Sequence, residues 1–389
     1  EKVSILQYEV IKVGLTFIDI FSGVGGFRLG MEMAGHRCVG HCEIDKYANK
    51  SYEAMHDIKE DEWFGEDISR IRAEELPRAD VWCAGFPCQD ISIGGKKLGF
   101  KGDRSSLFFR ITRLIRDTKE EDRPKYLFIE NVKNFFSVNG GFDFLKFQVE
   151  LAEVGYDVEW QLLNSKDFGV PQNRERVFII GHLRGRSGRK VFPIGGVSRA
   201  IKVPQLACGD YRYDKGLRLR YSGVSPCLCA STKKMVSRND LSSSIFVVGN
   251  INPSKKGMGG RVVDSIGISP TLTVNKGIGE KILVRENTKL GYKDAEHGDS
   301  INLAYMNSEN RRARVGKQIV NTLTTSCSHG VLLSGRVRRL TPLECWRLQG
   351  WPDEYFYKAA SVCSNTQLYK QAGNGVTVSV IYEIAKKLE

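Results

Sequence analysis

The sequence lacks any uninterrupted apolar run of about 18 residues, the length at which a segment becomes a candidate membrane-spanning helix. It also shows no basic and apolar secretory signal at its start. We therefore expect no membrane binding and a cytoplasmic location. The hydrophobic content of 41% is ordinary for a globular protein with a sizeable core, and the length of 389 residues favours about two domains.

Closely paired metal ligands are missing as well. The ten cysteines include no Cys-x-x-Cys pair, and the six histidines show no matching ligand spacing. The most closely spaced cysteines are Cys38/Cys42, Cys83/Cys88 and Cys227/Cys229. Structural zinc sites usually need tighter and repeated spacing. We expect no bound metal, and we expect reduced thiols, as is usual in the cytoplasm.

Acidic residues are scarce in one block of the chain. Residues 181–340 hold 28 Lys and Arg against 10 Asp and Glu, which gives a net charge of +18. Residues 1–180 carry −5 and residues 341–389 are neutral, so the whole excess of +13 arises in this block. Clustered cations neutralise phosphate groups, and the pattern therefore favours a polyanion-binding region over a merely solubilising surface.

A strand, a glycine turn and a helix are expected near the start of the chain. Residues 15–21 form a short apolar run, and a helical pattern follows the turn. Glycines in such a turn let the backbone approach a ligand closely. The pattern is not the dinucleotide motif G-x-G-x-x-G, because Arg28 stands at the sixth position. The turn itself contains Ser22, Gly23, Gly25 and Gly26.

A second expected strand, residues 37–44, ends in Glu43 and Ile44 about 20 residues beyond the turn. An acidic residue at this place typically accepts hydrogen bonds from ribose hydroxyls. The two features together indicate an adenosine-containing cofactor without a pyrophosphate. Asp67 and Ile68 could close the adenine side of this pocket, and Leu107 could face it from the first turn of a helix over 105–118.

The stretch Gly85-Phe86-Pro87-Cys88-Gln89 follows an apolar run, residues 79–84, that is typical of a buried strand. Pro87 stiffens the backbone just before the thiol, and the glycine-rich cationic segment 89–102 follows it. Ligands of parallel α/β sheets bind beyond the carboxyl ends of the strands. A cysteine at that edge can act as a nucleophile once deprotonated, although a lone Pro-Cys pair is more often structural.

Two more polar groups stand at the ends of expected strands. The apolar run 125–129 ends in Glu130 and Asn131, and Arg174 and Arg176 lead into the apolar run 177–181. A carboxylate at the same sheet edge as a cysteine would be the second chemical landmark of a site. Alone, it is only a polar strand end.

The alternation of apolar runs with helical patterns predicts an α/β fold with a doubly wound, mostly parallel sheet. Helical periodicity fades at about residue 184 and returns at 336, where Thr341 and Pro342 are expected to start a helix. We therefore predict a catalytic and cofactor-binding domain over 1–184, a smaller irregular β-rich domain over 185–335, and a return to the first domain over 336–389.

Six motifs in this order resemble those of the bacterial and phage type of DNA (cytosine-5)-methyltransferases. They span residues 17–388, and the resemblance implies the fold of S-adenosylmethionine-dependent methyltransferases. It also implies that residues 185–335, where the basic excess lies, form the target recognition domain. The motifs are Phe21-Ser22-Gly23-Val24-Gly25-Gly26, Gly85-Phe86-Pro87-Cys88-Gln89, Glu130-Asn131-Val132, Gln172-Asn173-Arg174-Glu175-Arg176, Arg339-Leu340-Thr341-Pro342 with Glu344-Cys345, and Gly373-Asn374-Gly375.

The resemblance implies that the Cys88 thiolate attacks C6 of a cytosine that has been flipped out of the DNA duplex. Glu130 would neutralise the charge that develops on the ring. By position, Arg176 should hold the cytosine O2, and Arg174 should support it or contact a phosphate. Asn131 would orient the end of its strand.

The resemblance also implies S-adenosyl-L-methionine as the cofactor. Gly375 departs from the pattern, because relatives often carry serine there, and only a backbone contact is expected from it. Ile44 and the residues of the glycine turn belong to the same expected site. By family position the remaining lining residues should be Phe21, Glu43, Asp67, Ile68, Leu107 and Asn374.

Double-stranded DNA is the expected partner of a monomeric enzyme, and any cognate restriction endonuclease is expected to act on the same sequence without direct contact. A tRNA cytosine-5 methyltransferase is the nearest alternative, but the large basic block without an appended RNA module favours DNA. The absence of an Asp-Pro-Pro-Tyr or Asn-Pro-Pro-Tyr motif disfavours amino-group methylation. The intact Cys88, Glu130 and Arg176 argue against a catalytically silent DNA-binding module.

Overall fold

The computed structural model describes the chain in several segments. Pro87, Cys88 and the segment 89–102 lie outside the described residues. The structure describes residues 14–86, 106–137, 141–186, 188–195, 209–212, 216–219, 246–250, 261–264, 282–288, 290–304, 314–333 and 336–389.

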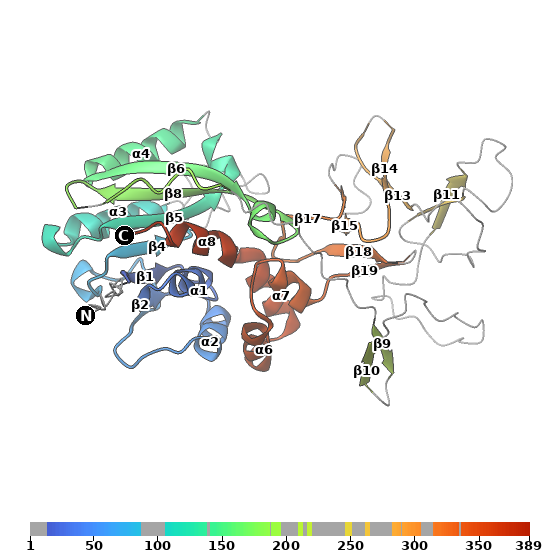
Figure 1. The fold of residues 1–389 in the computed structure, drawn as a ribbon, viewed down its shortest axis with the longest axis horizontal. Helices are drawn as coiled ribbons and strands as arrows, with labels where there is room; N and C mark the ends of the chain where they lie inside the picture. The colour runs from blue at the N-terminus through green and yellow to red at the C-terminus, as the bar shows by residue number, and fades with distance from the viewer. Residues whose placement is uncertain are drawn as a thin grey trace, which may run out of the picture.

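A seven-stranded sheet forms the core of the larger part of the molecule, on the left of Figure 1. Its order is β3-β2-β1-β4-β5-β8-β6, and every neighbouring pair is parallel except the two that involve β8. This confirms the predicted doubly wound, mostly parallel sheet. The strand order reverses between β1 and β4, which is where such folds bind ligands. The strands are β1 Thr16–Ile20, β2 Arg37–Cys42, β3 Trp63–Gly65, β4 Val81–Ala84, β5 Tyr126–Val132, β6 Tyr156–Asn164 and β8 Glu175–Leu183.

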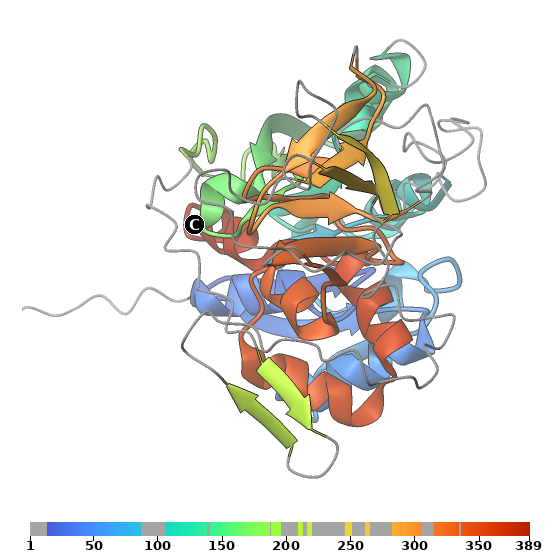
Figure 2. The same cartoon turned by 90° about the vertical axis from the view of Figure 1, so that its right-hand side faces the viewer.

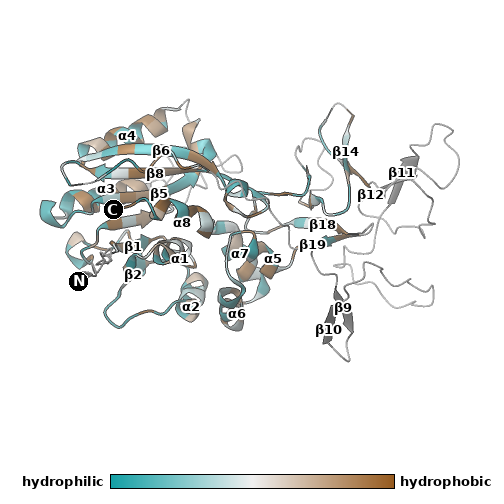
Figure 3. Ribbon diagram, viewed as in Figure 1, coloured by the Kyte–Doolittle hydropathy of each residue, from teal (hydrophilic) through white to brown (hydrophobic). Residues whose placement is uncertain are grey.

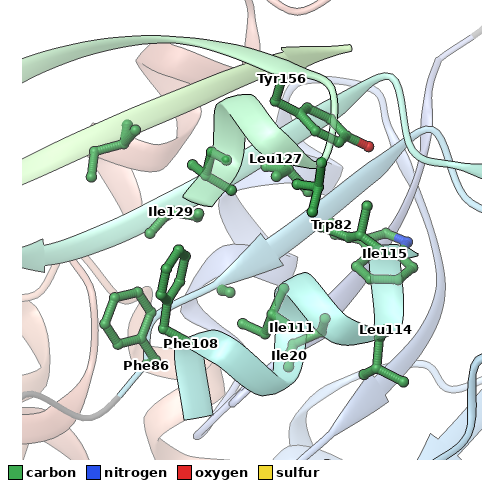
Figure 4. Packing of buried hydrophobic residues seen from close by; sticks show 14 of the residues in the cluster. Ile20, Trp82, Phe86, Phe108, Ile111, Leu114, Ile115, Leu127, Ile129 and Tyr156 are labelled. Atoms are coloured by element: carbon green, nitrogen blue, oxygen red, sulfur yellow. The ribbon is translucent and has the colours of Figure 1, made fainter. Parts of the chain in front are cut away.

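Helices cover both faces of this sheet. Successive residues of a strand point to opposite faces, and in β1 Phe17 and Ile18 belong to different hydrophobic clusters. The Phe17 cluster contains side chains of α1 (Gly26–Met33) and α8 (Val378–Ala385). The Ile18 cluster contains side chains of α3 (Ser106–Asp117) and α4 (Phe142–Glu153), and Figure 4 shows part of it. Because both faces are covered, the central strands are largely apolar, as the brown segments of Figure 3 show.

The C-terminal region adds helices beside the sheet. The predicted helix α5 (Pro342–Arg347) begins with a capping box, in which the Thr341 side chain accepts from Glu344 N and the Glu344 carboxylate accepts from Thr341 N. Two helices that the sequence analysis did not predict, α6 (Asp353–Val362) and α7 (Asn365–Asn374), pack with α5 in one hydrophobic cluster. Lys370 of α7 forms a 2.6 Å ion pair with Asp45, the N-cap of α2 (Lys46–Met55).

Short strands make up the smaller part, on the right of Figure 1 and toward the viewer in Figure 2. A four-stranded sheet has the order β16-β15-β18-β19, and β17 pairs in parallel with β7 of the larger part. Strand β7 is Gln172–Asn173, and the strands of the smaller part are β9 Gly209–Arg212, β10 Gly216–Leu219, β11 Phe246–Asn250, β12 Arg261–Asp264, β13 Ile282–Arg285, β14 Tyr292–Ala295, β15 Ser300–Asn302, β16 Val315–Gly316, β17 Val320–Asn321, β18 His329–Leu333 and β19 Arg336–Arg339.

Short 3-10 helices complete the described elements. They are η1 Ala73–Glu75, η4 Glu120–Asp122, η5 Lys133–Phe136 and η7 Ser165–Phe168. Among the described residues, no helix combines the length and the apolar character needed to cross a membrane.

Candidate active site at the carboxyl edge of the large sheet

The turn after β1 has the backbone geometry that close approach of a ligand requires. Phe21, Gly23 and Gly25 all have positive φ angles, of 58°, 56° and 85°. Gly25 N donates to Ser22 O at 2.8 Å and closes the turn. A side chain at Gly25 would collide with the imidazole of His56, so glycine is required there by space as well as by conformation.

Glu43 ties the end of β2 to this turn. Its Oε2 accepts from Gly23 N at 2.8 Å, and its Oε1 accepts from Asp45 N at 2.7 Å. Each carboxylate oxygen can accept a further hydrogen bond, so Glu43 retains capacity for a ribose hydroxyl. The neighbouring Ile44 is 67% exposed, which leaves an apolar surface beside the carboxylate.

The segment after β3 lies beside Glu43, because Glu43 N donates to Gly65 O at 3.1 Å. Asp67 accepts from the hydroxyl and the backbone N–H of Ser69, and the hydroxyl bond is the main reason why the pKa of Asp67 lies below its ordinary value. Ile68 is buried, and its carbonyl accepts from Arg110 Nε of α3 at 3.2 Å. This contact also places the first turn of α3, with the half-buried Leu107, near this edge.

The turn between α7 and α8 reaches the same place from the other end of the chain. A Cβ atom on Gly26 would lie 2.7 Å from the Val376 side chain, so the two turns are in direct contact. Asn374 is the exposed last residue of α7, and Gly375 follows it. The structure thus places the glycine turn, the end of β2 with Glu43 and the α7–α8 turn at one edge of the sheet, and Ile68 lies buried in the core cluster beside them.

The residues present fit an adenosine-containing cofactor. Ser22 is 7% exposed, and its hydroxyl has no hydrogen-bond partner within the part of the chain that the structure describes. A Cβ atom built on Gly23 meets nothing within 4 Å, so the turn is open on that side. An unsatisfied hydroxyl, an open glycine and the Glu43 carboxylate are the donors and acceptors that a nucleoside would use.

Glu130 and Arg176 meet because β5 and β8 run antiparallel. Val132 lies opposite Arg176 in the register and Glu130 lies opposite Phe178, which places both side chains at one end of the strand pair. Arg176 Nε lies 3.0 Å from Glu130 Oε1. This is an ion pair rather than an aligned hydrogen bond, because Glu130 Oε1 has no hydrogen-bond partner among the described residues. The carboxyl group therefore keeps hydrogen-bonding capacity for a bound base.

The carboxyl group of Glu130 faces the chain that leads to Cys88. Glu130 Oε2 lies 3.8 Å from the position that a Cβ atom on Gly85 would take, and Gly85 is three residues before the cysteine. Phe86 is 2% exposed and packs against Phe108 of α3 with a ring-centroid distance of 5.7 Å, as Figure 4 shows. Asn131 Oδ1 accepts from Val132 N at 2.8 Å.

Arg174 is 4% exposed and faces inward. Its Nη2 donates to Gly375 O at 2.8 Å, while its Nε and Nη1 have no hydrogen-bond partner within the described ranges. Burial, which disfavours the charged form, lowers the pKa of Arg174 to about 9, and the nearby charge of Arg176 adds to the effect. This guanidinium therefore joins the arginine segment to the Asn374–Gly375 turn.

Sequence reasoning missed a buried ionic network beneath the glycine turn. Arg28 is 2% exposed and its Nη1 lies 2.6 Å from Glu62 Oε2. Asp19 is fully buried and accepts from Arg28 N at 3.2 Å, and burial raises its pKa to about 8. The available signal was a carboxylate within the apolar run of β1, followed by an arginine on the first turns of α1.

Comparison with known proteins points to one family. The model of the C-5 cytosine-specific DNA methylase family matches residues 15–389. Orphan methyltransferase M.SPRI of Bacillus phage SPR is 34% identical, with 96% of this chain and 97% of that protein covered. Type II methyltransferase M.HhaI of Haemophilus parahaemolyticus is 31% identical, with 96% and 93% covered.

A solved structure supports the fold. A putative DNA modification methyltransferase encoded within an Escherichia coli prophage superposes with a TM-score of 0.57 at 20% identity, covering 96% of this chain and 98% of that one. At this identity the likeness speaks for the fold alone. Given the match of the family model and the two relatives, the chain belongs to the C-5 cytosine-specific DNA methylase family.

Proposed function

We propose that this protein methylates C5 of a flipped-out cytosine in a specific double-stranded DNA sequence, with Cys88 as the nucleophile. The proposal rests chiefly on the Glu130–Arg176 ion pair, because the Glu130 carboxyl group faces Gly85, three residues before Cys88 in the sequence. Members of the family catalyse S-adenosylmethionine-dependent methylation of cytosine C5 in DNA. We infer that this chain works as a monomer in the cytoplasm, independently of any endonuclease.

The cofactor would be held at the β1–β4 reversal. The open backbone at Gly23 and the unsatisfied Ser22 hydroxyl would meet it on one side, and the Glu43 carboxylate would accept from its ribose hydroxyls. Phe21, Ile44, Leu107 and the Asn374–Gly375 turn would complete the pocket. When bound, S-adenosylmethionine supplies the electrophilic methyl group that C5 of the cytosine accepts.

The protein's own groups make C5 reactive. Attack of the Cys88 thiolate on C6 forms an S–C6 bond and moves the electrons of the C5–C6 double bond onto C5. Glu130, protonated or sharing a proton with N3, neutralises the charge on the ring, and Arg176 donates to O2. After methylation, loss of the C5 proton restores the double bond as the S–C6 bond breaks. Cys88 leaves as a thiolate.

We infer that residues 185–335 act as the target recognition domain. The inference rests on the net charge of +18 over residues 181–340 and on the short-stranded sheets that replace the α/β pattern there. Clustered cations bind the phosphate backbone, and other side chains must read base edges. A tRNA substrate has less support, because the family model is that of DNA methylases. A catalytically silent binding module has less support, because the Glu130–Arg176 ion pair is intact.

Bisulfite sequencing tests the proposal directly. DNA from cells that express the full chain should contain 5-methylcytosine within one short sequence, and DNA from cells that express Cys88→Ser should not. Purified protein should also methylate duplex DNA in preference to tRNA. Methylation of tRNA alone, or of adenine and cytosine amino groups, would contradict it.

A further inference from the structure

One buried side chain connects the two parts of the molecule. Gln172 is 0% exposed and lies in β7, which pairs in parallel with β17 so that Val320 stands opposite Gln172. Val320 N donates to Pro171 O at 2.9 Å, and the Thr322 hydroxyl donates to Asn173 O at 2.9 Å. The arginine segment is thus hydrogen-bonded to the chain that runs into the last two strands of the four-stranded sheet.

The amide group of Gln172 holds two distant points of the chain. Its Oε1 accepts from Leu323 N at 3.1 Å, and its Nε2 donates to Leu348 O at 2.8 Å. The chain between these two points contains β18, β19 and α5. One side chain therefore holds both ends of the segment that contains β18, β19 and α5, and both of its hydrogen bonds are buried.

The same segment carries the arginines of the site. Arg174 follows Gln172 by two residues and is bonded to Gly375 O, and Arg176 follows by four and pairs with Glu130. Buried hydrogen-bonded networks of this kind define one geometry, since a displaced partner leaves an unsatisfied buried group. A shift of β17 or of the end of α5 must therefore displace the backbone that carries Arg176.

We propose that Gln172 is a positioning residue that makes the placement of Arg176 depend on the placement of the β18–β19–α5 segment, so that methyl transfer responds to correct target recognition. The inference rests on the proposed function, because it assumes that the smaller part of the molecule reads DNA. Coupling of this kind typically changes discrimination by about 2- to 30-fold.

The test measures discrimination rather than activity alone. Full-length protein methylates a plasmid library in which randomised base pairs flank a cytosine, and bisulfite sequencing gives a relative rate for every sequence. In Gln172→Met, which keeps the volume but loses both hydrogen bonds, the ratio between the best sequence and its single-base-pair neighbours should fall by about 2- to 30-fold. The thermal shift on adding S-adenosylhomocysteine should stay unchanged.

Two controls make the result decisive. Gln148→Met removes an amide from α4, away from the site, and should leave the ratio unchanged. Thr322→Val removes only the bond to Asn173 O at a solvent-accessible position and should lower the ratio less, even if Gln172→Met does not fold. A matching Thr118→Val, just after α3, removes a hydroxyl bond to Leu114 O and should not lower it.

The possible outcomes test the positioning role of Gln172 and the proposed function separately. A uniform loss of rate with an unchanged ratio in both Gln172→Met and Thr322→Val would overturn the positioning role, because loss of folded protein lowers all rates equally. A wild-type protein that methylates no sequence in the library would overturn the proposed function, and the inference would fall with it.

Discussion

Among the candidate catalytic residues, Glu130 has the best-defined surroundings in the described part of the chain. The residue is 9% exposed, and its carboxyl group lies 3.0 Å from Arg176 Nε and faces Gly85. A carboxyl group in this position can stabilise charge that develops on a bound base. The partial burial matters, because removal of water strengthens each of these electrostatic contacts.

Replacing Glu130 with glutamine should lower the rate of methyl transfer by about 10²- to 10⁴-fold, since an amide cannot transfer a proton to the ring. Cofactor affinity should change little, because Glu43 and the glycine turn make the expected contacts. Single-turnover kinetics and S-adenosylhomocysteine binding would measure both quantities. Glu153→Gln, on the exposed surface of α4, serves as the matched control. Lost cofactor binding with intact chemistry would refute the assigned role.

Replacing Cys88 with serine should abolish methyl transfer, because an alkoxide is far harder to generate than a thiolate at neutral pH. Wild-type protein should form a covalent adduct with DNA that carries 5-fluorocytosine, since fluorine blocks the final elimination. A denaturing gel would detect the adduct, which should be absent in Cys88→Ser and present in Cys363→Ser, a half-buried thiol elsewhere. Turnover by the Cys88 variant at the wild-type rate would exclude the covalent route.

At the scale of elements, β1 and α1 are joined by buried polar groups as well as by the glycine turn. Arg28 on α1 is paired with Glu62 and also donates to Asp57 O at 3.1 Å. Such a pair is costly to bury and costlier to break. The network therefore gives the turn one position relative to the strand.

The buried Asp19 should make folding stability depend on pH. Burial raises its pKa from 3.8 to about 8, so between these values the folded chain binds a proton that the unfolded chain releases. This contribution is fully present below the unfolded pKa and is lost as pH rises through the folded one, with a slope of at most about 1.4 kcal/mol per pH unit.

Asp19→Asn keeps an acceptor for Arg28 N but does not titrate, so its stability should fall less between pH 5 and pH 8 (roughly the window set by the two pKa values). Urea unfolding at several pH values would compare it with the wild type and with the exposed control Asp61→Asn. Equal pH slopes for wild type and Asp19→Asn would show that Asp19 does not titrate in this range.

At the scale of the whole molecule, the change in net charge coincides with the change in architecture. The α/β part is net acidic, and the basic excess accompanies the short-stranded part. Phosphate contacts weaken with salt, whereas base contacts determine the sequence preference. Overall affinity for DNA and sequence preference should therefore respond separately to changes in residues 185–335.

Replacing residues 185–335 with the equivalent region of a relative should change which cytosine is methylated, while Cys88 remains essential. Neutralising scattered Lys and Arg in this region should instead weaken binding to all duplexes and reduce the salt dependence. Bisulfite sequencing and binding isotherms at several salt concentrations would separate the two effects. An active chimera that kept the original target sequence would place recognition elsewhere in the chain.

The sequence by itself determined most elements of the large sheet and the order of the motifs. Apolar runs, turn glycines and the Thr341 cap act within a few residues, so they predicted the strands, the glycine turn and α5. They also indicated that Glu43 and Glu130 stand at strand ends. Local pattern did not reveal α6 and α7, whose apolar side chains share one cluster with α5 and with distant segments such as Met55 of α2.

Only the tertiary structure decided which of these groups meet. The antiparallel pairing of β8 with β5 joins Arg176 to Glu130, and packing of the C-terminal turn joins Arg174 to Gly375 across 201 residues. The two hydrogen bonds of Gln172 span 151 and 176 residues. Such contacts follow from strand order and from the packing of distant segments. Periodicity along the chain carries no information about either.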